Sequence, residues 1–263
     1  MKILDGRELA GFIKERQAHV VLGLRAEKKT PKLVIVRDSE NPVIMKYVGL
    51  KKQYGEDIGI EVSDVFADGL GELKRAVLEA NEDPKVSGII VQLPLSNPDW
   101  TDEVVSLISP EKDVDGLSGQ GKFDSATATA INWLLSGHNI DLSGKKIAIV
   151  GHGRLVGKPL EKMWLASGLD VAVFHRGSDF SLLKDFDVIV TATGNPHLIS
   201  SEMIRSGAVV VDAGTASEDG VIVGDINDEI RGRGDLLALT PKIGGVGPLT
   251  VAVLFENVIQ ATK

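Results

Sequence analysis

Residues 147–168, "IAIVGHGRLVGKPLEKMWLASG", form a pattern of a buried strand, a tight glycine turn and a helix. Gly151 permits the turn, and Gly153 lets the backbone come close to a phosphate. The start of the following helix offers free N–H groups and the positive end of the helix dipole. The spacing is Gly-x-Gly-x-x-x-Gly, one residue longer than the common dinucleotide fingerprint, so an ordinary strand–helix turn is the alternative.

The next strand adds evidence for a dinucleotide. "LDVAVFHRGSD" (169–179) ends in His175 and Arg176, about where such a site contacts the adenosine ribose. NAD sites usually carry Asp or Glu at that point, whereas an Arg suits the 2′-phosphate of NADP. An exposed Arg without a ligand is the alternative. The following strand ends in "VIVTATGNP" (188–196), whose small side chains leave room for a flat cofactor. These residues predict a nicotinamide dinucleotide domain and favour NADP.

The first half of the chain alternates apolar runs with amphipathic ones. Continuous β-branched runs separated by helices indicate a parallel sheet that is covered on both faces. The expected strands are residues 32–38, 61–67 and 87–95, and the expected helices follow Asp5, begin at Pro42, and cover about 70–82 and 99–108.

A polar, glycine-bearing segment, "SPEKDVDGLSGQGKFDSATATA" (109–130), separates this half from the second and is interpreted as a crossing between two units. The alternation then resumes, with strands expected near 146–150, 170–174, 187–191 and 208–212. The last helix is expected to begin at Pro248, and its apolar stripe must dock on one of the two units. The predicted fold class is α/β, with two domains that each hold a mostly parallel sheet flanked by helices. The second domain is Rossmann-like.

Composition excludes several classes of function. The 263 residues carry a net charge of −8, which does not favour a nucleic-acid partner. No apolar run reaches the roughly 18 to 20 residues that span a bilayer, so no membrane association is expected. There is no cysteine, and the five histidines lack metal-ligand spacing, so no metal is expected. A reducing compartment is compatible with this composition, and the charged N-terminal residues do not resemble a signal peptide. A cytoplasmic location is therefore expected.

The stretch "NPVIMKYVGLKKQYG" (41–55) contains both tyrosines of the chain. Asn41 is a good N-cap and Pro42 a good first helical residue, so a helix over 42 to about 54 is predicted. On this helix an i, i+4, i+7, i+11 spacing aligns four residues, which are Tyr47, Lys51, Tyr54 and Ile58. A lysine in such a stripe either extends to the surface or is held in a cleft, where its pKa would fall and it could exchange protons near neutral pH.

Two further groups in the first half could contact a ligand. Gln92 ends the buried strand in "VQLPL", and its amide could hydrogen-bond the edge of a heterocycle. "KDVDGL" (112–117) places Asp113 and Asp115 in the crossing segment, where a carboxylate could accept hydrogen bonds from a ring amine and amide. Turn chemistry is the alternative for these aspartates, because Asp-Gly is a strong turn signal.

Together these segments resemble the bifunctional methylenetetrahydrofolate dehydrogenase/methenyltetrahydrofolate cyclohydrolases. Four blocks carry the resemblance in the family's order and spacing: "YVGLK" (47–51), "NEDPKVSGIIVQLPL" (81–95), "KDVDGL" (112–117) and "TPKIGGVGPLTVAVLFENV" (240–258). The glycine turn, "VGHGRLVGKP" (150–159), fits the family more loosely. A short-chain dehydrogenase would also use Tyr-x-x-x-Lys, but after its cofactor glycines rather than before them.

The resemblance implies a folate-binding catalytic domain of residues 1–118 plus 245–263 and an NAD(P)-binding domain of residues 119–244, with the site in the cleft between them. Lys51 would transfer the proton, with Gln92 assisting it. Tyr47 would stack on the folate ring, and Asp115 would hold the pterin. The dinucleotide would be bound by residues of the second domain: Gly151, His152 and Gly153 at its phosphates, Arg176 at the ribose phosphate, and Thr215 near the nicotinamide.

The implied activity belongs to one-carbon metabolism, which supplies purine biosynthesis. It comprises NADP-dependent oxidation of 5,10-methylenetetrahydrofolate and hydrolysis of the methenyl product to 10-formyltetrahydrofolate, by a homodimer. The chain departs from the family pattern after residue 116, at Gly153 in place of a serine, and at Ile243 in place of a proline. The alternatives are therefore a monofunctional cyclohydrolase, an NAD-dependent variant or a non-catalytic folate- or nucleotide-binding paralogue. A shikimate-type dehydrogenase shares the architecture but does not explain "VQLPL" or "GGVGP".

Overall fold

The computed structural model describes residues 1–218 and 221–263. The chain divides into two compact units. The small-sheet unit contains Gly11–Ala126 and Val251–Lys263, and the large-sheet unit contains Met1–Ala10 and Thr127–Thr250. Each unit has a parallel α/β architecture, as the sequence predicts.

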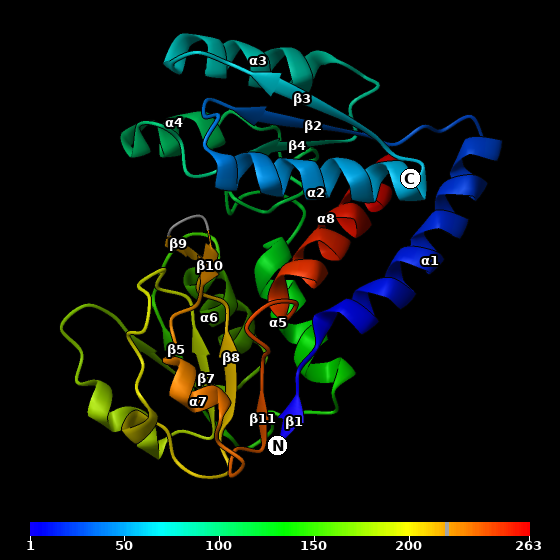
Figure 1. Ribbon diagram of the computed structural model, residues 1–263. Coiled ribbons are helices and arrows are strands. Elements are labelled where there is room, and N and C mark those ends of the chain that lie inside the picture. The colour runs from blue at the N-terminus through cyan, green and yellow to red at the C-terminus, as the bar shows by residue number, and fades with distance from the viewer. Residues whose placement is uncertain (219–220) are drawn as a thin grey trace. The chain divides into compact units, whose positions relative to one another are not determined.

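The small-sheet unit is built on three parallel strands in the order β3-β2-β4. These are β2 (Lys32–Arg37), β3 (Glu61–Phe66) and β4 (Gly88–Val91). Helices α2 (Pro42–Ile58) and α3 (Leu70–Glu82) lie on opposite faces of this sheet (Figure 1). The unit also contains most of α1 (Gly6–Ala26) and α8 (Val246–Thr262), together with the short helices η1 (Pro98–Trp100) and α4 (Thr101–Val105).

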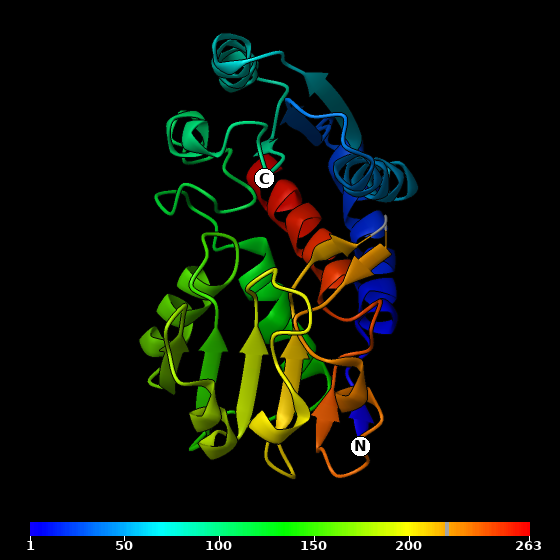
Figure 2. The same ribbon diagram turned by 60° about the vertical axis from the view of Figure 1, so that its left-hand side comes forward.

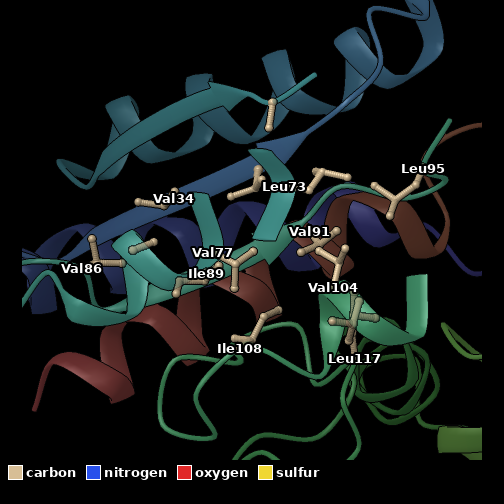
Figure 3. Packing of buried hydrophobic residues seen from close by; sticks show 14 residues of the cluster. Val34, Leu73, Val77, Val86, Ile89, Val91, Leu95, Val104, Ile108 and Leu117 are labelled. Carbon is tan, nitrogen blue, oxygen red and sulfur yellow. The ribbon is translucent and has the colours of Figure 1, made fainter. Parts of the chain in front are cut away.

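Strand β2 is buried on both faces, which explains its continuous apolar run. Val34 and Val36 face α3, where they pack with Leu73 and Val77 in one core cluster. Figure 3 shows Val34, Leu73 and Val77 beside Ile89 and Val91 of β4 and Val104 of α4. Leu33 and Ile35, which alternate with them, are fully buried outside that cluster. Alternation along a pleated strand therefore supplies two cores from a single segment.

The second core of this unit is closed by α8. Phe255 stacks on Tyr54 with ring centroids 5.0 Å apart. The Tyr54 hydroxyl donates to Gln17 Oε1 at 2.8 Å, and Gln17 Nε2 donates to the Ala252 carbonyl at 2.9 Å. One aromatic pair and one buried amide thus tie α1, α2 and α8 together. Tyr54 is in this way a structural residue.

Helix α2 begins and ends as its sequence dictates. Asn41 Oδ1 accepts the Val43 N–H at 2.9 Å, and Pro42 opens the helix. The helix continues to Ile58, past the expected end near 54, because Gly59 provides the left-handed C-cap at φ 79°.

The large-sheet unit holds six parallel strands in the order β1-β11-β8-β7-β5-β6, which lie side by side in Figure 2. They are β1 (Lys2–Ile3), β5 (Lys146–Val150), β6 (Asp170–Phe174), β7 (Val188–Thr191), β8 (Val209–Asp212) and β11 (Ala238–Leu239). An antiparallel pair of short strands, β9 (Ala216–Glu218) and β10 (Val221–Val223), follows β8. The helical elements are α5 (Ala126–Gly137), α6 (Gly157–Ala166), η2 (Phe180–Asp185), η3 (Ser201–Met203) and α7 (Asp228–Arg231).

The strand order reverses direction at β5. The chain passes from β5 to β6 on one side and then returns to β7 on the other. In open parallel sheets, ligands bind outside the carboxyl ends of the strands at such a switch point. The glycine turn after β5 therefore lies at the expected edge.

Several expected boundaries were wrong. Strand β4 ends at Val91 rather than residue 95, since Pro94 has no N–H to donate. The helix expected over 99–108 is η1 followed by α4, which ends at Val105. Helix α5 begins at Ala126, inside the segment interpreted as a crossing, because small buried alanines leave little periodic signal. Helix α8 begins at Val246, two positions before Pro248.

Candidate active site

Lys51 lies on α2 among its buried residues, which are Ile44, Val48, Tyr54, Gly55 and Ile58. Its ammonium group does not extend into solvent. Lys51 Nζ donates to Gln92 Oε1 at 2.7 Å, and the side chain is half-buried. A lysine in an apolar stripe either extends to the surface or is held in place, and in this structure Gln92 holds Lys51 in place.

Gln92 is fixed from both sides. It follows β4 directly, and its backbone N–H donates to the Val36 carbonyl at 2.8 Å. Its Nε2 donates to the Leu93 carbonyl at 3.0 Å, which leaves Oε1 as the acceptor that faces Lys51. At 8 % exposure, the amide has little freedom to turn. Gln92 therefore sets the direction of the Lys51 amine.

The two aspartates of "KDVDGL" differ sharply. Asp113 is fully buried, and its carboxylate accepts the N–H groups of Leu117 and Ser118 and the Ser118 hydroxyl, at 2.6 to 3.1 Å. The Asp115 carboxylate is half-buried and accepts no hydrogen bond within the described residues. Gly116 makes the turn between them and the next segment, with φ 67°. Asp113 thus anchors the altered segment after residue 116, and Asp115 remains available to a ligand.

Lys51 and Asp115 influence each other electrostatically. Burial lowers the pKa of the Lys51 ammonium, and the negative charge of Asp115 partly opposes that shift. Burial also raises the pKa of Asp115; the Lys51 charge counteracts this, and the charge of Asp113 adds to it. A shift in these directions brings both groups closer to the pH range in which proton transfer is useful.

Tyr47 lies one turn before Lys51 on α2. Its ring is half-buried, and burial raises the pKa of its hydroxyl, so the phenol is neutral at pH 7. The hydroxyl makes no hydrogen bond within the described part of the chain. A partly exposed ring beside a desolvated amine can stack on a flat heterocycle, in contrast to Tyr54, whose ring and hydroxyl are both occupied.

The glycine turn after β5 has the expected close contacts. Gly151 has φ 100°, and a Cβ there would lie 2.5 Å from the Ala192 carbonyl oxygen. A Cβ on Gly157, the first residue of α6, would lie 1.9 Å from the Gly151 carbonyl oxygen. Gly153 instead faces open space. The first and third glycines allow packing, and the second leaves room beside the turn.

The other predicted cofactor residues are spread along the same sheet edge. Strands β5 and β6 pair through Val150 and Phe174, so Gly151 and Arg176 come after neighbouring strand ends. Arg176 is exposed and has no ion pair in residues 1–218 and 221–263. The His152 Nε2 lies 2.7 Å from Glu161 Oε2 on α6. Thr215 is exposed and follows β8, which β7 separates from β5.

These features fit a dinucleotide. In the part of the chain that the structure describes, no side chain caps the N-terminus of α6, and the positive end of its dipole favours an anion. The space beside Gly153 can accept a phosphate, and the Arg176 guanidinium can pair with a second one. Within the same described residues, no group of three or more His, Asp or Glu side chains could hold a metal ion, and no helix is long and apolar enough to cross a membrane.

Comparisons with known proteins identify the family. Residues 4–115 match the tetrahydrofolate dehydrogenase/cyclohydrolase catalytic domain, and residues 125–263 match the NAD(P)-binding domain of the same family. The chain belongs to the tetrahydrofolate dehydrogenase/cyclohydrolase family. This membership confirms the resemblance drawn from the sequence blocks.

Individual members of the family are similar over the full length. The bifunctional protein FolD of Lactobacillus delbrueckii subsp. bulgaricus is 38 % identical, covering 100 % of this chain and 97 % of that protein. The crystal structure of the bifunctional FolD dehydrogenase/cyclohydrolase of Campylobacter jejuni has a TM-score of 0.91 at 33 % identity, covering 100 % and 98 %. The Trypanosoma brucei dehydrogenase-cyclohydrolase, complexed with NADP and an inhibitor, has a TM-score of 0.90 at 30 % identity, covering 99 % and 96 %.

The family's two domains divide the candidate residues into two sets. Lys51, Tyr47, Gln92 and Asp115 fall within the matched catalytic domain. Gly151, His152, Gly153, Arg176 and Thr215 fall within the matched NAD(P)-binding domain. The structure brings Lys51, Gln92 and Asp115 together and places Gly151 and Arg176 at neighbouring strand ends, whereas Thr215 lies farther along the edge.

One group near the NAD(P)-binding turn was missed by sequence reasoning. Asp225 is fully buried, and its Oδ2 accepts the Thr193 N–H at 2.6 Å. It lies just after β10 in a segment without clear periodicity, so no sequence pattern singled it out. The structure shows close packing beside it, since a Cβ on the preceding Gly224 would lie 1.9 Å from Asp212 Oδ2.

Proposed function

We propose that this chain oxidises 5,10-methylenetetrahydrofolate with NADP and hydrolyses the methenyl product to 10-formyltetrahydrofolate. The observation that carries the proposal is the Lys51 amine, desolvated, bound to Gln92 and electrostatically coupled to Asp115. A family member that had lost its chemistry would have no need to keep an amine with a lowered pKa. Membership of the dehydrogenase/cyclohydrolase family supports the same reaction pair.

In the hydrolytic step, water adds to the carbon of the methenyl cation, and neutral Lys51 accepts a proton from that water. The adduct's hydroxyl then loses its proton to solvent as the carbon–nitrogen bond to one folate nitrogen breaks; that nitrogen takes the proton held by Lys51, and the formyl group stays on the other nitrogen. Burial of Lys51 favours the neutral amine, and the positive charge of the bound methenyl group favours it further. Gln92 Oε1 holds the amine in one direction so that its lone pair can face the water.

Substrate binding is assigned to Tyr47 and Asp115. The half-buried Tyr47 ring offers a face for the pterin or the adjoining aromatic ring. The Asp115 carboxylate can accept hydrogen bonds from the ring amine and ring N–H of the pterin, which are charge-assisted and therefore strong. Both assignments are supported by side chains whose polar atoms have no hydrogen-bond partner within the described residues.

NADP, when bound, supplies the acceptor of the hydride that leaves the methylene carbon. Gly151, His152 and Gly153 would hold its phosphates, and Arg176 would pair with the 2′-phosphate. Arg176 is exposed and has no ion pair among residues 1–218 and 221–263, which supports NADP over NAD. Thr215, at the end of β8, would lie near the nicotinamide.

We assign the folate chemistry to residues 1–118 plus 245–263 and the dinucleotide to residues 119–244. We further propose a cytoplasmic homodimer. Light scattering on a sizing column tests the dimer, and a mass equal to one chain would contradict it.

The function is tested with two separate assays. Reduction of NADP or NAD is followed with methylenetetrahydrofolate, and disappearance of methenyltetrahydrofolate is followed without a dinucleotide. Activity in both supports the proposal, and hydrolysis alone would indicate a monofunctional cyclohydrolase. Folate binding without either turnover would contradict the proposal and indicate a non-catalytic paralogue.

A further inference from the structure

Asp225 is a fully buried carboxylate beneath the loops that follow β7 and β8. Its Oδ2 accepts the Thr193 N–H at 2.6 Å in the loop after β7. On the side of the loop after β8, a Cβ on Gly214 would lie 2.2 Å from Oδ1, so the backbone there packs directly on the carboxylate. Oδ1 has no hydrogen-bond partner within the described residues.

The loop that Asp225 holds is in contact with the glycine turn. A Cβ on Gly151 would lie 2.5 Å from the Ala192 carbonyl oxygen and 3.1 Å from Thr193 Cγ2. Strands β5 and β7, which these segments follow, are neighbours at the switch point of the sheet. Asp225 therefore acts on the turn through one intervening loop, Ala192–Gly194, although it cannot touch a ligand itself.

We propose that Asp225 is a positioning residue for the dinucleotide, whose ionised carboxylate fixes the Ala192–Gly194 backbone against the glycine turn, so that dinucleotide affinity depends on its ionisation. The inference rests on the proposed function because it requires a dinucleotide at this turn. A protonated carboxyl group is a weaker acceptor than a carboxylate, and the Thr193 N–H would then be held less tightly.

The charged groups around Asp225 favour titration in an accessible range. Burial raises its pKa to about 6, hydrogen bonds from Thr193 and Gly194 oppose this, and the charge of Asp212 adds to it. Asp212 Oδ1 also accepts the Asp225 N–H at 3.0 Å. The remaining charges lie one contact farther out: Arg231 pairs with Asp212 at 3.0 Å, and Asp228 pairs with Lys242 at 2.8 Å and is influenced by His197.

The test compares dinucleotide affinity across pH for wild type, Asp225→Asn and Asp228→Asn, by calorimetry between about pH 5 and about pH 8. NAD is titrated beside NADP because the 2′-phosphate of NADP itself titrates near pH 6 and NAD lacks it. Asp228 is the control, an exposed carboxylate on α7. For wild type we expect the affinity for NAD to fall with decreasing pH, by at most about tenfold per pH unit. We expect Asp225→Asn to lose this pH dependence and Asp228→Asn to keep it.

A second measurement needs no variant. If the ionised form binds the dinucleotide, NAD binding by wild type near pH 6 must release a fraction of a proton, which calorimetry in buffers of different ionisation enthalpy detects. Stability separates positioning from a merely structural role. Replacing the ionised buried group by a neutral amide should leave the melting temperature at pH 8 unchanged or raised, whereas the affinity for NAD at that pH falls.

The outcomes are distinguishable. The proposal is overturned if wild type binds NAD with the same affinity across this range, or if Asp225→Asn keeps the wild-type pH dependence and proton release. Absence of any NAD or NADP binding by wild type at every pH overturns the inference together with the proposed function. Normal binding without linkage to Asp225 overturns the inference alone.

Discussion

The edge of the small sheet and the edge of the large sheet carry different kinds of charged group: titratable groups that are partly buried at the first, and an exposed permanent cation at the second. Near the end of β4, the Lys51 amine and the Asp115 carboxylate are half-buried, and burial shifts the pKa of each towards its neutral form. After β5 and β6, the candidate site consists of backbone, open space beside Gly153 and the exposed guanidinium of Arg176. The first arrangement suits a group that must gain and lose a proton, and the second suits permanent binding of an anion.

The comparison explains why a lysine is used in one place and an arginine in the other. A buried lysine readily becomes neutral, whereas a guanidinium stays charged at any physiological pH. Asp225 is the exception in the large-sheet unit, since it is a buried carboxylate with a raised pKa that has no direct access to a ligand. A shifted pKa by itself therefore does not identify a catalytic residue, and the contacts of the group decide its role.

The largest effect is expected from Lys51→Met. Removing the amine should lower the rate of methenyltetrahydrofolate hydrolysis by about 10²–10⁴-fold, the usual scale of a general base. The control is Lys52→Met, which changes the exposed neighbour on the same helix. Hydrolysis is followed by loss of methenyl absorbance. A wild-type rate in Lys51→Met would mean that the site at the end of the small sheet does not supply the proton-transfer group.

Asp115→Asn should weaken folate binding and shift a pH profile in the same variant. Loss of charge-assisted hydrogen bonds worth about 1.5–3 kcal/mol corresponds to a KM higher by about 10- to 150-fold. Asp115 raises the pKa of Lys51, so its neutralisation lets that pKa fall further.

With neutral Lys51 as the proposed base, hydrolysis at saturating folate should rise with pH through the Lys51 pKa. The acid limb should therefore move to lower pH in Asp115→Asn. Glu111→Gln, at an exposed site in the same segment, is the control. A higher KM with an unchanged acid limb would mean that Asp115 binds folate but does not influence the pKa of Lys51.

Arg176→Ala tests the proposed dinucleotide site of the large-sheet unit. Loss of a charge-assisted contact worth about 1.5–3 kcal/mol should weaken NADP binding by about 10- to 150-fold and leave NAD binding unchanged. Competition between the two dinucleotides gives the ratio directly. Lys184→Ala, on the neighbouring η2, should preserve it. An unaltered preference for NADP in Arg176→Ala would remove the reason for assigning that cofactor.

The smallest effect separates the two tyrosines of α2. Tyr54→Phe removes the hydrogen bond to buried Gln17 and should lower the free energy of unfolding by about 1–2 kcal/mol. Tyr47→Phe should change it by less than about 0.5 kcal/mol, since its hydroxyl is not paired within the described residues. Urea unfolding measures both. Equal losses would mean that Tyr47 is as structural as Tyr54.

The sequence alone determined the α/β class, the presence of two domains and most helices and strands, because periodicity and capping are local properties. The Asn41–Pro42 helix start and the turn at Gly151 required no knowledge of the rest of the chain. The sequence did not predict the two-residue strand β1, because its pairing partner leaves no local pattern. It also did not predict the alanine-rich start of α5, because small buried side chains leave no periodic pattern.

The site divides in the same manner. Lys51, Gln92 and the two aspartates stood out by residue type and by resemblance, but spacing left open whether the lysine reached solvent and which aspartate was free. Only the tertiary structure decided these questions, by bringing Gln92 to Lys51 and by turning Asp113 into the loop it anchors. The physical reason is that desolvation and hydrogen bonding depend on neighbours that are distant in the chain. For the same reason, Asp225 could be identified only from its contacts in the folded structure.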